Sequence, residues 1–201
     1  RLTDMGLTYP CFCTRADIMA TQAPHETDGR VVYKGTCRPK DVIADAENDV
    51  ADTACRVPTA TNHISPSIEG GVGVGLATTR LIVPDCTIPF TDGHYGRHDI
   101  NLAEHCGDYI IRRKDGAWAY QLAVVVDDAL MGVTEIVRGR DLLLSSPQQI
   151  HLRELLFGEQ KTENGKLIHS ALPVNLFHHP LLCNAECQRL CKRDKSMDLG
   201  Y

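Results

Sequence analysis

Short runs of hydrophobic residues in the second half of the chain predict buried strands. Residues 120–128 read YQLAVVVDD, which predicts a strand that is buried on both faces and ends in two carboxylates, and residues 127–131 then begin a short helix. A second buried strand is predicted over 133–137, with Arg138 at its carboxyl end. This alternation predicts α/β order for the second half of the chain.

A helical pattern follows these strands. The sequence SPQQ at 146–149 has the form of a capping box with proline at the first helical position, and it predicts a helix through Leu155. Together the elements predict part of an open, largely parallel sheet, whose ligands bind outside the carboxyl ends of its strands. Tyr120 lies near the start of its predicted strand, so its side chain has to reach such a site by another route.

The middle of the chain alternates with a shorter period and predicts a small, mostly antiparallel module. The turn Asp115-Gly116 is a strong hairpin signal. Strands are predicted over 80–83, 87–90, 108–112 and from Ala117 onward. An amphipathic helix is predicted over 39–54, and the glycine-rich stretch 65–79 predicts a linker or hairpin rather than a phosphate-binding loop, since its GGVGVG has no lysine.

Near the beginning of the chain the pattern predicts a compact knuckle. Thr14 is placed to cap a short helix over 15–20, and Asp17 stands where a carboxylate suits a helix N-terminus. A strand is predicted over 31–33, and the turn over 34–37 returns a cysteine toward the first two cysteines.

Composition limits the class of protein. The 201 residues are 43% hydrophobic and 23% charged, which is typical of a globular protein with one large domain or two small ones. The net charge of −5 argues against a protein that simply coats nucleic acid, and neither a bilayer-spanning run nor a signal peptide is present, so we expect no membrane and no DNA partner. Nine scattered cysteines fit free thiols in a reducing, cytoplasmic location.

Four residues of the knuckle are candidates for a zinc site: Cys11, Cys13, Tyr33 and Cys37. Cysteines separated by a single residue are poorly placed for a disulfide with each other, but both can reach one ion, and an oxygen could complete a tetrahedral shell. The spacing is weaker than a pair of Cys-x2-Cys motifs, so three ordinary thiols remain the alternative.

Two further groups suggest chemistry. A late basic run, Arg189, Lys192, Arg193 and Lys195, could neutralise charge on a polyphosphate, with a solvated basic surface as the alternative. Tyr120 and Arg138 could bind a small carboxylate, because a guanidinium forms a two-pronged pair with one. The alternative for Arg138 is a structural pair with Asp127, Asp128 or Asp141. Other candidates are interpreted as surface histidines (His94, His98), incidental thiols (Cys183, Cys187, Cys191) and a packing residue (Trp118).

Five stretches occur in the order of one known family. They read GLTYPCFCTR, YKGTCR, DGAWAYQLAVVVDDALMGVTEIVRGRDLL, SSPQQIHLRELL and HHPLLCNAECQRLCKRDKS. Together they resemble the glutamyl-Q tRNA(Asp) synthetases, class I paralogues of glutamyl-tRNA synthetase. The resemblance is weak between about 42 and 101, where the chain carries extra sequence. Shared order across five motifs is far more specific than any one of them.

The resemblance implies a ligase that activates glutamate with ATP and transfers it to the queuosine base in the anticodon of tRNA(Asp). It implies two parts: a connecting module over 1–115, with a zinc knuckle in 1–40 and an insertion over about 42–101, and the second half of a Rossmann-like nucleotide-binding domain over 116–201. We expect a monomer. The family's HIGH motif belongs to an N-terminal half expected before Arg1, and the chain reads as a piece of a longer protein. We therefore expect the chain alone to bind zinc but not to activate glutamate.

The resemblance also implies roles for individual residues. Cys11, Cys13, Tyr33 and Cys37 match zinc ligands, and Tyr120 and Arg138 match glutamate-binding residues. Residues Arg189 to Arg193 match the loop known as KMSKS, with Lys192 as its ATP-contacting, catalytic lysine and magnesium as the expected companion of ATP. Cys191 replaces the usual serine of this loop and Cys187 a usual glycine.

Two alternatives remain open. One is a glutamyl-tRNA synthetase cut before its anticodon-binding domain, which would charge tRNA(Glu). The other is a zinc-stabilised RNA-binding module without catalysis.

Overall fold

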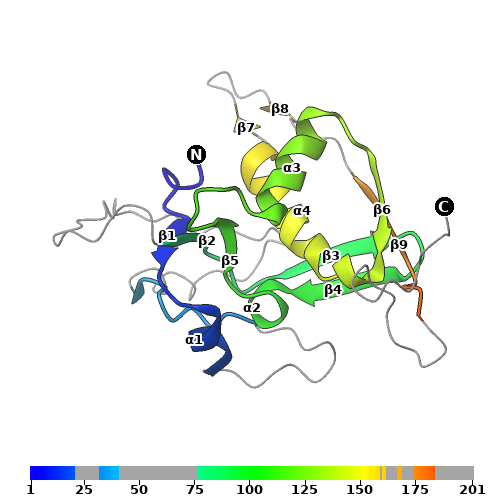
Figure 1. The fold of residues 1–201 in the computed structure, drawn as a ribbon. Helices are drawn as coiled ribbons and strands as arrows, with labels where there is room; N and C mark the ends of the chain where they lie inside the picture. Colours follow the sequence, from blue (N-terminus) through cyan, green and yellow to red (C-terminus); the bar gives the residue numbers. More distant parts are fainter. Residues whose placement is uncertain (21–31, 41–76, 159, 162–166, 169–173, 184–201) are drawn as a thin grey trace, which may run out of the picture.

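A computed structural model describes residues 1–20, 32–40, 77–158, 160–161, 167–168 and 174–183. Two sheets lie side by side (Figure 1); helix α4 packs on strand β3 of the larger sheet, and helix α3 packs along α4 and contacts β5 of the smaller sheet. The smaller sheet belongs to the knuckle end of the molecule, and the larger one carries the α/β part. The predicted helix over 39–54 and most of the stretch over 65–79 lie outside the described residues.

The smaller sheet is antiparallel, with the order β1-β2-β5. Its strands are β1 (Thr8–Cys11), β2 (Thr78–Leu81) and β5 (Tyr109–Arg112). After β1 comes α1 (Arg15–Ala20), and the predicted cap is present: the Thr14 hydroxyl accepts from the Asp17 backbone N–H at 3.2 Å, and Asp17 accepts from both the backbone and the hydroxyl of Thr14. This part of the prediction is confirmed.

The larger sheet is mixed, with the order β4-β3-β9-β6. Its strands are β3 (Thr87–Asp92), β4 (Gly96–Asn101), β6 (Glu135–Gly139) and β9 (Asn175–His179). Strand β9 pairs in parallel with both β3 and β6, whereas β3 and β4 form an antiparallel hairpin. The α/β class is confirmed, and strands from both sides of residue 115 share this one sheet.

Helix α3 (Tyr120–Leu130) replaces the buried strand predicted for the same residues, so that prediction is wrong. Three consecutive valines favour a strand locally, but propensity is a weak preference that packing overrides. Val125 is buried against the core, and the helix packs along α4. Gly132, with φ of 69°, follows the helix end and provides the left-handed residue that commonly terminates a helix.

Helix α4 (Ser145–Phe157) is present, but the predicted capping box is wrong. The helix begins two residues earlier, after the short 3-10 turn η2 (Arg140–Leu142), and its N-cap, Leu144, has no side-chain cap. Ser146 and Gln149 are three apart on one side of the helix, and both side chains accept hydrogen bonds from Arg138 instead. The sequence pattern assigned these two side chains to a helix cap, but they form tertiary hydrogen bonds with Arg138 instead.

Smaller elements also differ from the prediction. Of the strand predicted over 31–33, residue 31 lies outside the described residues, and the described part forms a bridge between Tyr33 and Gly107. The strand predicted from Ala117 onward is reduced to one bridge between Arg112 and Trp118. The hairpin turn at Asp115-Gly116 is confirmed, with φ of 86° at Gly116. Trp118, interpreted from the sequence as a packing residue, is 62% exposed, and the Arg112 guanidinium lies 5.2 Å from the centre of its ring.

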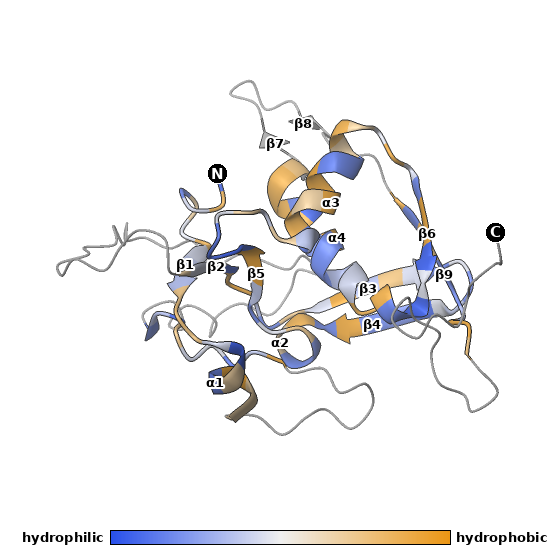
Figure 2. Cartoon of the chain, viewed as in Figure 1, coloured by the Kyte–Doolittle hydropathy of each residue, from blue (hydrophilic) through white to orange (hydrophobic). Residues whose placement is uncertain are grey.

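The core lies between the sheets and the two long helices. Hydrophobic and polar residues are mixed along α3 and α4 (Figure 2), and Val125 of α3 and Leu152 and Leu155 of α4 are buried in the core. The side chains of Leu81, Leu102 and Leu152 are fully buried there. The remaining elements are short: α2 (Leu102–His105), which Asn101 caps, and the pair β7 (Gln160–Lys161) and β8 (Leu167–Ile168).

Most of the described cysteines are thiols and not disulfides, as the composition predicts. These thiols are Cys11, Cys13, Cys37, Cys106 and Cys183. Cys86 differs, because it is disulfide-bonded.

Candidate functional site

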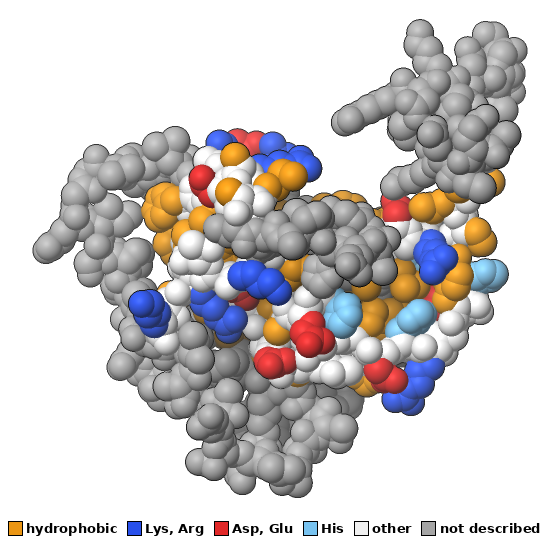
Figure 3. Space-filling view, turned by 90° about the horizontal axis from the view of Figure 1, so that it is seen from below, with side chains coloured by type: hydrophobic (Ala, Val, Ile, Leu, Met, Phe, Trp, Pro, Cys, Tyr) orange, Lys and Arg blue, Asp and Glu red, His pale blue; other side chains and the backbone are white. Residues whose placement is uncertain are grey.

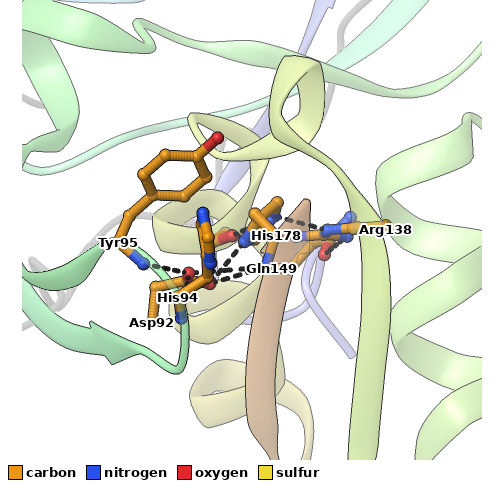
Figure 4. A network of polar contacts seen from close by, with 7 residues as sticks. Asp92, His94, Tyr95, Arg138, Gln149 and His178 are labelled. Atoms are coloured by element: carbon orange, nitrogen blue, oxygen red, sulfur yellow. Dashed lines mark hydrogen bonds and ion pairs between the residues drawn. The ribbon is translucent and has the colours of Figure 1, made fainter. Parts of the chain in front are cut away.

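Three polar side chains meet where the parallel strands of the larger sheet end. Asp92 is the last residue of β3, His178 is the fourth of five in β9, and Arg138 is the fourth of five in β6. Arg138 and His178 are direct partners in the β6–β9 register. Figure 4 shows the three side chains pointing toward one another. The predicted position of a ligand site, at the carboxyl ends of the strands, therefore holds a connected polar cluster.

Arg138 is held by three neutral acceptors. Its Nε donates to His178 Nε2 at 2.9 Å, its Nη1 to Gln149 Oε1 at 2.6 Å and its Nη2 to Ser146 Oγ at 2.9 Å. A guanidinium has five N–H donors, so two remain for Tyr120 or a ligand. Gln121 supports the arrangement by accepting from Gln149 Nε2 at 2.7 Å. These hydrogen bonds thus fix the position of the guanidinium, and none of its three acceptors is a carboxylate.

A buried carboxylate, that of Asp92, contacts the far side of the His178 ring from Arg138. Asp92 Oδ2 is 2.6 Å from His178 Nδ1, and both side chains are fully buried. Because His178 Nε2 accepts from Arg138, its proton is assigned to Nδ1, which donates to Asp92. Asp92 also accepts from the backbone N–H groups of His94, Tyr95 and His178, at 2.9 to 3.0 Å for the shortest bonds. The dyad of Asp92 and His178 fixes the direction of the Arg138 side chain.

The charges of this cluster follow from its burial. Burial raises the pKa of the Asp92 carboxyl, but the hydrogen bonds from His178 and the backbone outweigh it and lower the pKa to about 2. Burial lowers the pKa of Arg138, while interactions with Tyr120, Asp128 and Asp141 oppose that change. Arg138 therefore keeps its positive charge near neutral pH, because its ordinary pKa is far above 7.

Tyr120 and Arg138 are brought together, although Tyr120 stands at the start of a helix and not of a strand. Tyr120 lies close enough to the guanidinium to raise the pKa of Arg138, which opposes the effect of burial. Tyr120 is 52% exposed, so the pair faces an accessible surface. A hydroxyl and a guanidinium with two remaining donors can orient a small carboxylate.

Sequence reasoning missed Asp92, His178, Ser146 and Gln149 as parts of this site. Asp92 and His178 are 86 residues apart, and no local pattern joins them. The one available signal was the position of each residue at the carboxyl end of a strand in a parallel sheet.

The predicted zinc ligands also come together, at the other end of the molecule. The sulfur atoms of Cys11, Cys13 and Cys37 all lie within 4.8 Å of one another. The Tyr33 hydroxyl is 3.4 Å from Cys11 Sγ and 3.7 Å from Cys13 Sγ. Sulfur atoms on one tetrahedral zinc ion are ~3.8 Å apart, given Zn–S bonds of ~2.3 Å. The donors and their spacing therefore fit a zinc ion.

A buried cation stands behind this cluster. The Arg80 guanidinium lies 3.7 Å from the centre of the Tyr33 ring, and Arg80 is only 5% exposed. Burial raises the pKa of the Cys11 thiol, but hydrogen bonds with Tyr33 and Arg80 outweigh it and lower the pKa to about 7. A thiolate is the form that binds a metal, so the surroundings favour the ligand form of Cys11.

Asp108 anchors the knuckle. Its carboxylate accepts from the Tyr9 hydroxyl at 2.7 Å and from the Val83 backbone N–H at 2.8 Å, while Arg38 lies 3.6 Å away. The Asp108 carbonyl accepts from Arg80 at 2.6 Å. One buried residue thus connects β1, β5 and the segment that carries Cys37.

The remaining predicted site residues, Arg189, Lys192 and Arg193, lie outside the described residues. On the described surface seen from below, cationic and anionic side chains are interspersed, with histidines between them (Figure 3). Within the described part of the chain, none of the helices is both long and apolar enough to cross a membrane.

Comparison with known proteins agrees with this architecture. The model of the family described as tRNA synthetases class I (E and Q), catalytic domain, matches residues 68–199, which include part of the region expected to be inserted. The chain is 39% identical over 194 residues to a glutamyl-Q tRNA(Asp) synthetase of Neisseria meningitidis, covering 96% of the chain and 52% of that protein. It is 36% identical over 196 residues to the protein of the same name from Thiobacillus denitrificans, covering 97% and 50%.

A solved structure shares the fold. The crystal structure of a glutamate tRNA ligase from Elizabethkingia meningosepticum, in complex with its amino acid, superimposes with a TM-score of 0.53 at 20% identity, covering 100% of this chain and 34% of that one. The chain spans about half the length of the curated relatives that it matches.

Proposed function

Since the chain belongs to the class I tRNA synthetases (E and Q), we propose that it serves in a ligase that activates glutamate with ATP and transfers it to the queuosine base in the anticodon of tRNA(Asp). Relatives named glutamyl-Q tRNA(Asp) synthetase, 36–39% identical over most of the chain, support this choice of substrates.

The reaction has two steps. A carboxylate oxygen of glutamate forms a bond to the α-phosphorus of ATP, and the bond from that phosphorus to the bridging oxygen of pyrophosphate breaks. A nucleophile of the base then attacks the activated carbonyl carbon, and AMP leaves with the bonding electrons. Both steps depend on holding glutamate with one carboxylate directed at the phosphate.

Arg138 binds the carboxylate of glutamate that does not react, and Tyr120 completes its orientation. Three neutral acceptors hold the guanidinium of Arg138, and none of these three is a carboxylate. This observation carries the assignment. A carboxylate ligand can pair with the guanidinium directly, and two N–H donors remain to receive it.

The other components are assigned by the resemblance. Lys192, with Arg189 and Arg193, stabilises the charge on the leaving pyrophosphate, and magnesium accompanies ATP. Cys11, Cys13, Cys37 and Tyr33 hold zinc, which stabilises the knuckle and takes no part in either chemical step.

The first experiment is glutamate-dependent exchange of pyrophosphate into ATP on the full reading frame, with and without tRNA. Exchange without tRNA is expected. Exchange only with tRNA would favour the alternative of a glutamyl-tRNA synthetase, and no exchange under either condition would favour a binding module. The chain of 201 residues alone is expected to show none.

The role of Arg138 is tested by Arg138→Gln in the full reading frame. Loss of a charge partner costs about 2–5 kcal/mol, so kcat/KM for glutamate should fall about 30- to 5000-fold. Arg97→Gln is the matched control, because Arg97 is an exposed arginine on β4 that pairs with Asp99. An equal loss in both variants would show that Arg138 does not bind glutamate.

A further inference from the structure

An exposed tryptophan, Trp118, lies two residues before Tyr120 in the chain. Trp118 precedes Ala119, the N-cap of α3, and Tyr120, the first residue of that helix. It is 62% exposed, whereas tryptophan side chains are on average highly buried. The proposed binding of glutamate does not use this indole.

The hairpin that carries Trp118 is well ordered by its own hydrogen bonds. The Gly116 N–H donates to Arg113 at 3.0 Å, and the Arg113 N–H donates to Ala117 at 2.8 Å. The Ala119 N–H then donates to Ile111 in β5 at 2.9 Å. The backbone on both sides of Trp118 is thus tied to the sheet, so little ordering is needed when a ligand stacks on the ring.

One cation lies beside the indole, and two more follow it in the turn. The Arg112 guanidinium lies 5.2 Å from the centre of the Trp118 ring, and Arg112 Nε also donates to the Gly116 carbonyl. Arg113 and Lys114 follow in the turn, and Asp115 is the one acidic residue among these four, which gives a local charge of +2 (three cations less one anion). The whole chain carries −5, so this hairpin differs in sign from the average surface.

We propose that the hairpin of Arg112 to Trp118 is the surface on which a nucleobase of the RNA substrate stacks. Proteins recognise splayed bases by stacking them on aromatic rings, while neighbouring cations attract the phosphates. A base that reacts with an activated amino acid has to leave its own stack, and Trp118 offers a replacement beside Tyr120. The inference rests on the proposed function, because that function supplies the RNA partner.

The test uses the full reading frame with Trp118→Ala and Trp118→Phe. Stacking of one base is worth about 5- to 150-fold in affinity, so Trp118→Ala should raise KM for tRNA in the transfer step by that factor. Glutamate-dependent pyrophosphate exchange without tRNA should stay within about twofold, and Trp118→Phe should keep most of the tRNA affinity, since it retains an aromatic face. An unchanged KM, or an equal loss in both assays, overturns the inference.

Met131→Ala is the matched control. Met131 is 79% exposed at the opposite end of α3, so its removal also deletes an exposed hydrophobic side chain, but away from the hairpin. A similar rise in KM for tRNA in this variant would overturn the inference.

Fluorescence separates this inference from the proposed function. Trp118 is the one tryptophan of the 201 residues, so the difference between the spectra of the wild-type protein and Trp118→Phe isolates its signal. An RNA hairpin with the anticodon stem and loop of tRNA(Asp) should quench that signal, and heparin, a polyanion without bases, should not. Quenching without glutamate activation would overturn the proposed function alone; activation without quenching, or equal quenching by heparin, would overturn the stacking surface alone.

Discussion

Two buried aspartates organise the two ends of the molecule, and they do so with different partners. Asp108 stands behind the cysteine knuckle and Asp92 behind Arg138, with exposed fractions of 3% and 2%. Asp108 binds mainly through side chains of other segments, Tyr9 and Arg38, in addition to the Val83 backbone. Asp92 accepts three backbone N–H groups and one imidazole.

The difference shows what each aspartate stabilises. The bonds of Asp108 hold separate segments together around a cluster whose four donor residues lie between positions 11 and 37. The bonds of Asp92 fix the ends of β3 and β9 and orient His178, which in turn orients Arg138. Asp108 therefore supports a local motif, whereas Asp92 positions one side chain, that of Arg138, in a site assembled from distant strands.

The largest expected effect is loss of the metal from the knuckle. Cys37→Ala removes one of three thiolates, and a structural zinc contributes on the order of 10 kcal/mol to folding. We expect the wild-type chain to hold one zinc through dialysis against a weak chelator and Cys37→Ala to hold none, as measured by elemental analysis. Cys183→Ala, which removes an exposed thiol outside the cluster, should keep its zinc. Retention by Cys37→Ala would contradict the zinc assignment.

Asp92→Asn should have the next largest effect, on the other end of the molecule. A hydrogen bond to a charged group is worth about 1.5–3 kcal/mol, and the amide cannot accept from all four donors that the carboxylate serves, so the loss should be at least of that size. Asp99→Asn is the control, since Asp99 forms an exposed pair with Arg97 worth about 0–1 kcal/mol. Urea unfolding measures both values. The zinc content of Asp92→Asn should be unchanged, and a loss of zinc there would contradict the independence of the two ends.

The decrease in stability at acid pH should distinguish the contribution of Asp92 from those of other carboxylates. Its pKa is about 2 in the folded protein and close to 3.9 in an unfolded chain, so the unfolded state binds its proton first as the pH falls. Its contribution to stability is therefore complete above about pH 4 and is lost toward pH 2. Asp92→Asn should lack this part of the acid-induced decrease in the urea midpoint, whereas Asp99→Asn should retain it.

The sequence predicted local features better than features that depend on distant contacts. The capped helix over 15–20, the turn at Asp115-Gly116 and the gathering of Cys11, Cys13 and Cys37 are all present. Each depends on residues that are close in the chain or on the conformational freedom of glycine. Spacing alone left the cysteines open between zinc and ordinary thiols, and the family resemblance favours zinc.

The missed features have a common physical cause. The valine run of α3 favours a strand by local propensity, but packing along α4 determines a helix. Ser146 and Gln149 satisfy a capping pattern, yet Arg138 takes their side chains. His178 is 40 residues from Arg138, so only the sheet brings them together. In each case a contact between distant segments overrides a correct local preference.

A substitution with a smaller expected effect on the free energy of unfolding tests the side-chain partners of Asp108. Tyr9→Phe deletes the 2.7 Å hydrogen bond to the carboxylate, and a hydrogen bond to a charged group is worth about 1.5–3 kcal/mol. The free energy of unfolding should fall by that amount in the zinc-loaded chain. Tyr95→Phe is the control, because the Tyr95 contact to Asp92 uses its backbone N–H, which the substitution keeps. An equal loss of unfolding free energy in both variants would contradict the conclusion that Asp108 depends on side-chain partners and Asp92 on backbone N–H groups.

The smallest expected effect lies in the helix next to the zinc ligands. Thr14→Ala removes the hydroxyl that accepts from the Asp17 N–H, and loss of such a cap costs about 0.5–2 kcal/mol. Helix α1 buries none of its residues, so the loss should appear as local opening rather than as global unfolding. We expect faster hydrogen exchange at the Asp17 and Ile18 amides, with unchanged zinc content. Arg15→Ala, an exposed change in the same helix outside the cap, should leave these rates nearly unaltered. If Thr14→Ala instead releases zinc, the helix and the metal cluster form one cooperative unit, and the knuckle depends on its cap as Arg138 depends on Asp92.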